Sequence, residues 1–338
     1  MKNKTIFLIL VIVLFLTIVI SITLGSVKVG VLDSMKIVLS KIPFIKDMVN
    51  IENIPYSHLV IINNLRLPRI LLAGIVGMGL AVCGAMYQSI LKNPMADPYI
   101  LGVSSGAALG ATISIVLNRI ISIQLMAFIF SIIITVLVYA VSRYAHKKDN
   151  TSLILTGINI NYFLTSVISL IMILNKEQLD KIFFWTMGSF TTSTWKNVLI
   201  LGSIIIPITI IASFLWKYFN AIALDEKTAK SVGINTEKFK KIIIVMTCII
   251  TAICVSNCGI IGFVGLMIPH MVRIIFGGNY KLVIPMSGIV GAIFLILSDD
   301  LARTIISPTE IPIGIITAII GAPYLIYLIY RRQNEKHN

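Results

Sequence analysis

Charge is scarce in this sequence. Only 12% of its 338 residues are charged, whereas a soluble domain carries about a quarter. Hydrophobic residues make up 57% of the chain, and the mean hydropathy is +0.96. Apolar runs long enough to cross a bilayer recur from end to end, and the loops between them are too short to hold a soluble domain. We therefore interpret the chain as an all-α polytopic membrane protein with a single transmembrane domain over residues 1–338.

Groups for nucleotide, metal or acid–base chemistry are also missing. No Gly-Lys pair occurs, so the sequence has no G-x-x-x-x-G-K-[ST] loop to hold ATP phosphates. No cluster of histidine, aspartate and glutamate indicates a catalytic centre. The four cysteines lie in apolar segments without zinc-type spacing to histidines, at Cys83, Cys248, Cys254 and Cys258. We expect no catalytic residues, no bound metal and no cofactor on this chain.

Basic residues give a net charge of +14, but they lie in short loops between apolar runs, where they encode topology rather than nucleic-acid binding. With the N-terminus inside, one face receives 17 of the 28 basic and six of the 14 acidic residues. Because positive loops stay in the cytoplasm, both termini are predicted to be cytoplasmic. The ten candidate spans are residues 6–25, 67–90, 98–117, 120–142, 152–174, 196–216, 242–258, 262–276, 282–304 and 311–330.

A polar joint at residues 92–97 separates two of these apolar runs. Pro94 and Pro98 forbid a continuous helix there, so the chain breaks and restarts. Non-helical backbone at a membrane edge is tolerated where it is buried in protein or lines an aqueous path. The next helix has a face of small residues that lets a neighbour approach closely, with glycines at Gly102, Gly106 and Gly110. Together these features favour a helix at the edge of a pathway.

Two loops are long enough to form helices of their own. On the outer side, residues 31–42 have the pattern of an amphipathic surface helix. On the inner side, residues 217–241 contain a short helical pattern that Gly233 would end. The periodicity leaves open whether this inner segment offers a contact surface or is a solvated connector.

The residues around the joint resemble a known family. The stretch "GLAVCGAMYQSILKNPMADPYILGVSSGAALGA", residues 79–111, is similar to the signature of the FecCD-type permeases. These are the membrane subunits of ABC importers for iron-siderophores, haem and vitamin B12. The resemblance continues, in order and through nearly all of the chain after the first span, with "LRLPRI" at 65–70, "LILTGINI" at 153–160, "FWTMGSF" at 184–190, "NAIALDEKTAKSVGI" at 220–234, "GIIGFVGLMIPHMVR" at 259–273 and "SDDLARTIISPTEIPIGIITAIIGAPYLIYLI" at 298–329.

The resemblance implies a type II ABC importer permease with about ten transmembrane helices per subunit. Its partners would be a second permease subunit, identical or paralogous, two ATPase subunits that carry ATP and Mg, and an extracytoplasmic substrate-binding protein. The inner loop is then similar to the coupling helices that contact the ATPase. The residues that match this coupling motif are Leu224, Asp225, Glu226, Thr228, Ala229, Ser231 and Gly233.

The resemblance also assigns residues at both membrane faces. On the inner side, the positions that narrow the path in family members match Asn93, Met95, Asn150, Thr151 and Ser152. On the outer side, the positions whose arginines pair with glutamates of the binding protein match Arg66, Arg69 and Arg303. Ordinary helix capping, for Thr151 and Ser152, and membrane anchoring, for the arginines, are the alternatives. Asp299 and Asp300 are predicted to have a structural role near Arg303.

The predicted function is ATP-driven import of an iron chelate, a siderophore complex or haem, across the cell membrane by alternating access. A cobalamin importer is the alternative within the family. An ion-coupled secondary transporter is a second class, but it needs ionisable residues near the bilayer midplane, and the central spans have almost none.

Overall fold

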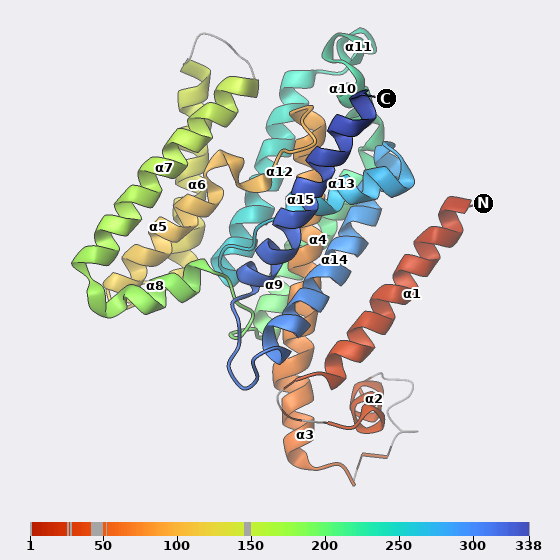
Figure 1. Ribbon diagram of the computed structural model, residues 1–338, viewed down its shortest axis with the longest axis vertical. Helices are drawn as coiled ribbons and strands as arrows, with labels where there is room; N and C mark the ends of the chain where they lie inside the picture. The colour runs from red at the N-terminus through yellow and green to blue at the C-terminus, as the bar shows by residue number, and fades with distance from the viewer. Residues whose placement is uncertain are drawn as a thin grey trace.

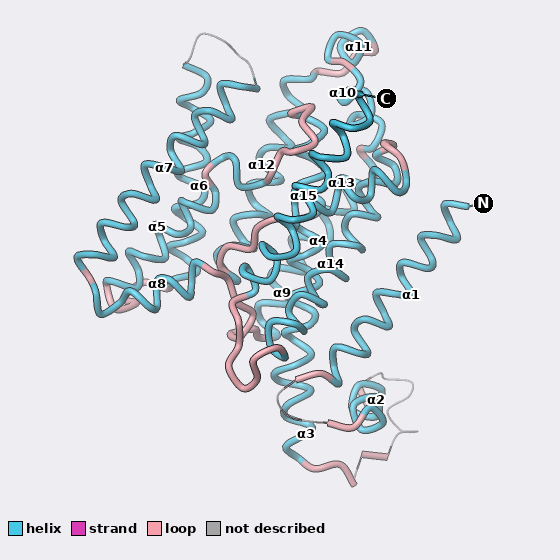
Figure 2. The backbone as a smooth tube through the Cα atoms, viewed as in Figure 1, coloured by secondary structure: helices cyan, strands magenta, loops and turns pink. Residues whose placement is uncertain are grey.

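The computed structural model describes residues 2–25, 27, 29–41, 50–51, 53–144 and 150–337, and over these ranges the chain consists of helices joined by short loops (Figures 1 and 2). Seven helical segments are long and apolar enough to cross a membrane. They are formed by α1 (Lys2–Thr23), α4 (Leu67–Ile90) with the turns before it, α6 (Ile123–Tyr144), α7 (Asn150–Leu174), α9 (Trp195–Phe214), α12 (Thr236–Cys258) and α14 (Tyr280–Thr304).

Three shorter apolar segments, in α5 (Val103–Val116), α13 (Val264–Phe276) and α15 (Ile313–His337), complete the set. Each of the ten predicted spans thus corresponds to an apolar helix, and the all-α membrane fold is confirmed. The third span begins later than predicted, because residues Pro98–Leu101 form a separate 3-10 turn, η3, before α5. Gly102 lies between them at a φ of 77°, a left-handed conformation that glycine adopts without a steric penalty.

Helix α4 is the centre of the bundle. It is buried over most of its length and contacts α9, α12, α13 and α14. Glycines allow the closest approaches, since a Cβ atom at Gly291 of α14 would lie 2.5 Å from the Gly77 carbonyl oxygen of α4. Small residues at crossing points are how membrane helices gain packing contacts without a hydrophobic driving force between them.

The two ends of the bundle differ, and Figure 1 shows both. One end carries the short helices α10 (Trp216–Leu224) and α11 (Glu226–Ser231), and the C-terminus lies beside them; we call it the α11 end. The other carries α2 (Val31–Leu39), α3 (Tyr56–Val60) and α8 (Leu179–Thr186), and we call it the α3 end. The amphipathic helix expected over residues 31–42 is present as α2, and residue 42 lies outside the described residues.

Helices α5, α6 and α7 form one side of the bundle in Figure 1. The predicted small-residue face of α5 lies against α6. A Cβ atom at Gly106 would lie 2.7 Å from the Phe130 carbonyl oxygen, and one at Gly110 would overlap the Met126 carbonyl oxygen. Gly102 lies against the Ile134 side chain. The backbone of α5 therefore rests directly on α6.

Gly106→Ala is expected to lower the free energy of unfolding by about 1–3 kcal/mol, because the added methyl group overlaps backbone and forces the two helices apart. Gly202→Ala in α9 is the matched control, since its Cβ atom would meet Ile75 at an ordinary 3.5 Å. Chemical unfolding of the detergent-solubilised chain measures both. Equal stability of the Gly106 and Gly202 variants would contradict the close α5–α6 contact.

Candidate functional site

The polar joint after α4 is a turn held by local hydrogen bonds. Lys92 has a left-handed φ of 52° at the end of α4. The Asn93 side chain then accepts a hydrogen bond from the Met95 backbone N–H at 2.9 Å. The Asp97 carboxylate accepts one from the Tyr99 backbone N–H at 2.7 Å and so caps η3. These local bonds replace the helical ones that the two prolines remove.

Side chains on both sides of the joint bind backbone carbonyls at and before the start of α13. The Tyr99 hydroxyl donates to the Ile261 carbonyl at 3.0 Å, and the Gln88 amide donates to the Leu266 carbonyl at 3.1 Å. Burial raises the pKa of the Asp97 carboxyl to about 6, against the opposing effect of the Tyr99 N–H. Burial thus favours the neutral carboxyl, whereas the Tyr99 N–H bond favours the ionised one.

The predicted gate residues lie in two places. Asn93 and Met95 are half-buried in the joint. Asn150 and Thr151 begin α7, but their side chains lie outside the described residues. The Ser152 hydroxyl donates a long hydrogen bond of 3.5 Å to the Ser142 carbonyl, between the facing ends of α7 and α6. The gating role of these residues stays a prediction.

The inner loop folds as two short helices with a sharp break between them. The backbone is extended at Asp225, whose carboxylate accepts hydrogen bonds from the N–H groups of Lys227 at 3.2 Å and Thr228 at 3.4 Å. Partial desolvation raises the pKa of Asp225, but these N–H groups and Lys92 outweigh it and hold the pKa below its ordinary value. Gly233 closes α11 at a φ of 84°.

Two large apolar side chains of this loop are exposed among charged and polar neighbours. Ala229 is fully buried, whereas Leu224 is 80% and Val232 67% exposed. Two further motif residues have internal partners: Glu226 pairs with Lys240, and the Ser231 hydroxyl donates to the Thr228 carbonyl at 2.8 Å. Most motif residues therefore shape α11, whereas Leu224 is exposed. Val232, which is not part of the motif, is a second exposed apolar side chain available for contact.

The loop is physically connected to the joint. Lys92 in the joint lies 3.6 Å from the Asp225 carboxylate. Helix α10 is anchored to α4, where the Ser89 hydroxyl donates to the Phe219 carbonyl at 3.0 Å. It is also anchored to the start of α14, where the Asn220 amide donates to Asn279 at 2.9 Å. An ion pair and hydrogen bonds thus connect α10 and the start of α11 to the end of α4.

At the α3 end, the three predicted docking arginines line one cavity of about 240 Å³, which we call the arginine cavity. Arg69 is held by two carboxylates. Its guanidinium donates to both Asp299 oxygens at 2.8 Å and to both Glu310 oxygens at 2.9 Å. Of these partners, Asp299 is buried and Glu310 is exposed.

The other two arginines bind the chain itself. Arg66 is buried and donates to the carbonyls of Ile22, at 2.7 Å, and Val27. Arg303 is buried, donates to the Ser21 carbonyl at 2.8 Å and pairs with Asp300. They therefore satisfy carbonyl groups at and beyond the end of α1, and the structural role predicted for Asp299 and Asp300 has matching contacts. A docking role for the arginines stays a prediction.

Sequence reasoning missed a polar stripe on α7. Four polar side chains recur at helical spacing and are exposed: Asn159, Tyr162, Ser166 and Ser169. Figure 1 shows α7 at the margin of the bundle, away from the central α4. The Ser166 and Ser169 hydroxyls donate within α7 to the carbonyls of Tyr162 and Thr165. The polar groups of Asn159 and Tyr162 are the ones that are costly against lipid, so this face fits an aqueous path or another subunit. The three- and four-residue spacing was the signal in the sequence that identifies it.

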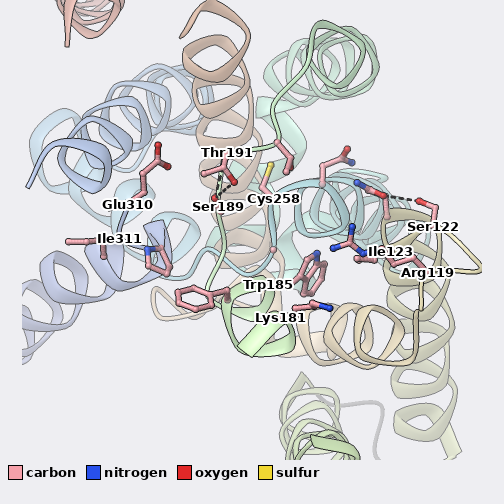
Figure 3. Close-up of a pocket in the computed structure, with 16 residues that line it drawn as sticks. Arg119, Ser122, Ile123, Lys181, Trp185, Ser189, Thr191, Cys258, Glu310 and Ile311 are labelled. Carbon is pink, nitrogen blue, oxygen red and sulfur yellow. Dashed lines mark hydrogen bonds between the residues drawn. The ribbon is translucent and has the colours of Figure 1, made fainter. Parts of the chain in front are cut away.

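A second cavity, of about 500 Å³, was also missed (Figure 3). It lies at the α3 end between the α5–α6 turn, α8, the end of α12 and the start of α15. Its lining is drawn from segments far apart in the sequence, so no local motif predicts it. Among the described residues, no group of three or more His, Cys, Asp and Glu side chains is placed to hold a metal ion.

Comparison with known proteins gives one consistent result. The FecCD transport family model matches residues 12–331. The hemin transport system permease protein HmuU of Yersinia pestis is 34% identical over 81% of the chain and 84% of its own length. The cobalamin import system permease protein BtuC of Halobacterium salinarum is 35% identical over 83% of the chain and 76% of its own length. A solved inward-facing structure, assigned to a metal-chelate type ABC transporter, superimposes with a TM-score of 0.84 at 33% identity, over 97% of this chain and 99% of that one.

Proposed function

Since the chain belongs to the FecCD transport family and is a permease subunit of an ABC importer, we propose that its cargo is an iron chelate, either a siderophore complex or haem. It is a multi-pass membrane protein, and ATP hydrolysis in such transporters belongs to a separate ATPase subunit. The similarity to a hemin permease and to a metal-chelate type transporter supports this cargo. Cobalamin is the second candidate because one relative is named for it.

The α11 end is proposed to be the cytoplasmic side, with both termini there and ATP and Mg held by the partner ATPases. The observation that carries this assignment is the exposed pair Leu224 and Val232 on a loop that stands outside the bundle. Exposed apolar residues on a rigid, capped loop fit a partner cleft. Closure of the ATPase dimer would push α11, and the contacts through Lys92 and α10 would carry that motion to the joint.

The cargo path is proposed to run along α7, between this chain and a second permease subunit, identical or paralogous. The polar stripe of α7 supplies neutral hydroxyl and amide groups that hydrogen-bond a passing ligand without holding it by charge. The joint at the α11 end, with Asn93 and Met95, is proposed as the inner closure. Alternating access then needs only the joint and the helix ends to move.

The substrate-binding protein is proposed to dock at the α3 end, where Arg69 carries the docking charge. Glu310→Gln frees Arg69 from its exposed carboxylate partner, so we expect the affinity for the binding protein to rise about two- to five-fold at low salt. The exposed acid Glu177 lies outside the arginine cavity, and Glu177→Gln is the control. Surface plasmon resonance on the reconstituted permease measures both. A rise of the same size in both variants would show only a change in overall charge.

The cargo itself is tested by ATP-driven uptake. The reconstituted importer is supplied with iron-55 siderophore complexes, haem or cobalamin, each delivered by its binding protein. We expect uptake of an iron chelate and none of cobalamin. Uptake of cobalamin alone would overturn the proposed cargo and leave the importer assignment intact.

A further inference from the structure

The larger cavity at the α3 end has an unbalanced charge. Of its lining side chains, Arg119 and Lys181 are basic and Glu310 is acidic. The Arg69 guanidinium, which lines the neighbouring arginine cavity, donates hydrogen bonds of 2.9 Å to both carboxylate oxygens of Glu310. Lys181 donates only to the neutral Gln178 amide, at 2.9 Å, and Arg119 has no side-chain acceptor among the described residues. Two cations therefore face the cavity without a carboxylate of their own, and we call it the cationic cavity.

The backbone holds Arg119 in a costly conformation. Asn118 and Arg119 both have left-handed φ values, 52° and 61°, between α5 and α6. Asparagine tolerates this conformation, but for arginine it costs about 1–2 kcal/mol. The turn is fixed by the Arg119 N–H, which donates to the Ser114 carbonyl at 2.8 Å, and by the Ser114 hydroxyl, which donates to the Ile121 carbonyl. The fold thus sets the backbone position of Arg119, from which its exposed side chain lines the cavity.

The remaining lining fits an organic ligand. Figure 3 draws Arg119, Trp185 and Lys181 on one side of the cavity and Glu310 across from them. Helix α8 supplies Trp185 and the exposed Phe184 as aromatic surface. Hydroxyl groups of Ser122, Ser189, Thr191 and Thr192 complete the lining. A volume of about 500 Å³ lies within the range of small-molecule sites, which combine apolar walls with a few polar groups.

We propose that the cationic cavity is a receiving site for an anionic, aromatic metal chelate, bound through Arg119 and Lys181 with its rings on Trp185 and Phe184. The proposal rests on the proposed function, since it names the class of iron chelate that the importer accepts. Guanidinium and ammonium groups pair with catecholate or carboxylate oxygens, and the guanidinium does so with two donors at once. A cationic chelate meets repulsion at the same site.

The site is tested by equilibrium binding to the full-length chain in nanodiscs. The probes are a trianionic ferric tris-catecholate, ferric enterobactin, and a cationic ferric tris-hydroxamate, ferrioxamine B. Quenching of tryptophan fluorescence reports binding, and Trp185→Phe shows how much of the signal arises in the cavity. We expect the tris-catecholate to bind, and Arg119→Glu with Lys181→Glu to weaken its affinity about ten-fold or more.

Two controls separate the site from general charge. Lys196→Glu removes an exposed cation outside the cavity and is expected to leave the affinity unchanged. Arg119→Lys with Lys181→Arg keeps both charges and is expected to stay within about two-fold of the parent. Parent affinity in the double charge reversal, or equal affinity for the cationic chelate, would overturn the proposal.

Transport by the full complex distinguishes this proposal from the proposed function. ATP-driven uptake of the tris-catecholate with an unchanged KM in the double charge reversal overturns the receiving site and leaves the iron-chelate importer standing. Absence of ATP-driven uptake for every iron chelate overturns the proposed cargo, whatever the binding experiment shows.

Discussion

Replacing Leu224 and Val232 with aspartate is expected to abolish ATP-driven uptake while the permease still folds and inserts. Both side chains are largely exposed, so the substitutions remove little internal packing. They place two carboxylates where the ATPase cleft is proposed to bury apolar surface, and an unpaired charge in an interface costs several kcal/mol. The measurements are co-purification of the ATPase and uptake in proteoliposomes.

Conservative changes provide the control for this experiment. Leu224→Met with Val232→Ile keeps the apolar surface and is expected to retain ATPase binding and uptake. Bulky residues at Ala229 act differently, because this side chain is fully buried and a larger one forces α11 out of position. Normal ATPase recruitment by the double aspartate variant would contradict the coupling assignment.

Arg303→Leu is expected to destabilise the chain by about 3–5 kcal/mol, because it leaves the buried Asp300 carboxylate without its cation and the carbonyls of Ser21 and Leu24 without a donor. Denaturant unfolding of the detergent-solubilised chain measures the change. Removal of both charges, in Arg303→Leu with Asp300→Leu, is expected to recover much of the lost stability, since apolar side chains often replace a buried ion pair at little cost.

Lys196→Ala serves as the exposed control, with a change of about 0.5 kcal/mol or less. If Arg303→Leu were as stable as the parent, the arginine would not hold the end of α1. A role in docking the binding protein alone would then gain support. Because Arg66 and Arg303 are buried, charge reversal of all three arginines tests folding as well as docking. The single change at Glu310 is therefore the cleaner docking experiment.

The membrane fold was predictable because bilayer crossing depends on length and hydropathy, which the sequence displays directly. The break at the joint was predictable for the same local reason, since Pro94 and Pro98 exclude a continuous helix. The start of α5 was not predictable, because η3 depends on the cap that Asp97 provides and on the left-handed conformation of Gly102. The inner loop was predicted as one short helix, and the Asp225 cap divides it into two helices instead.

The candidate sites were predictable only in part. The resemblance picks out arginines by position, but not that Arg66 and Arg303 are turned inward to carbonyls in the last turn of α1. That depends on tertiary packing between α1, α4 and α14, which no local pattern encodes. The cationic cavity is even less predictable from the sequence, because Arg119, Lys181 and Glu310 come from three distant segments. The ion pair of Lys92 with Asp225 likewise joins two segments that the sequence keeps far apart.

The most direct test of the ATP-driven importer is uptake by proteoliposomes that contain the permease, its ATPase and its binding protein. Uptake of the iron chelate is predicted to require ATP hydrolysis on the α11 side and to persist when proton and sodium gradients are dissipated by ionophores. Uptake that proceeds without the ATPase, and that collapses with an ion gradient, would contradict the account and identify a secondary transporter.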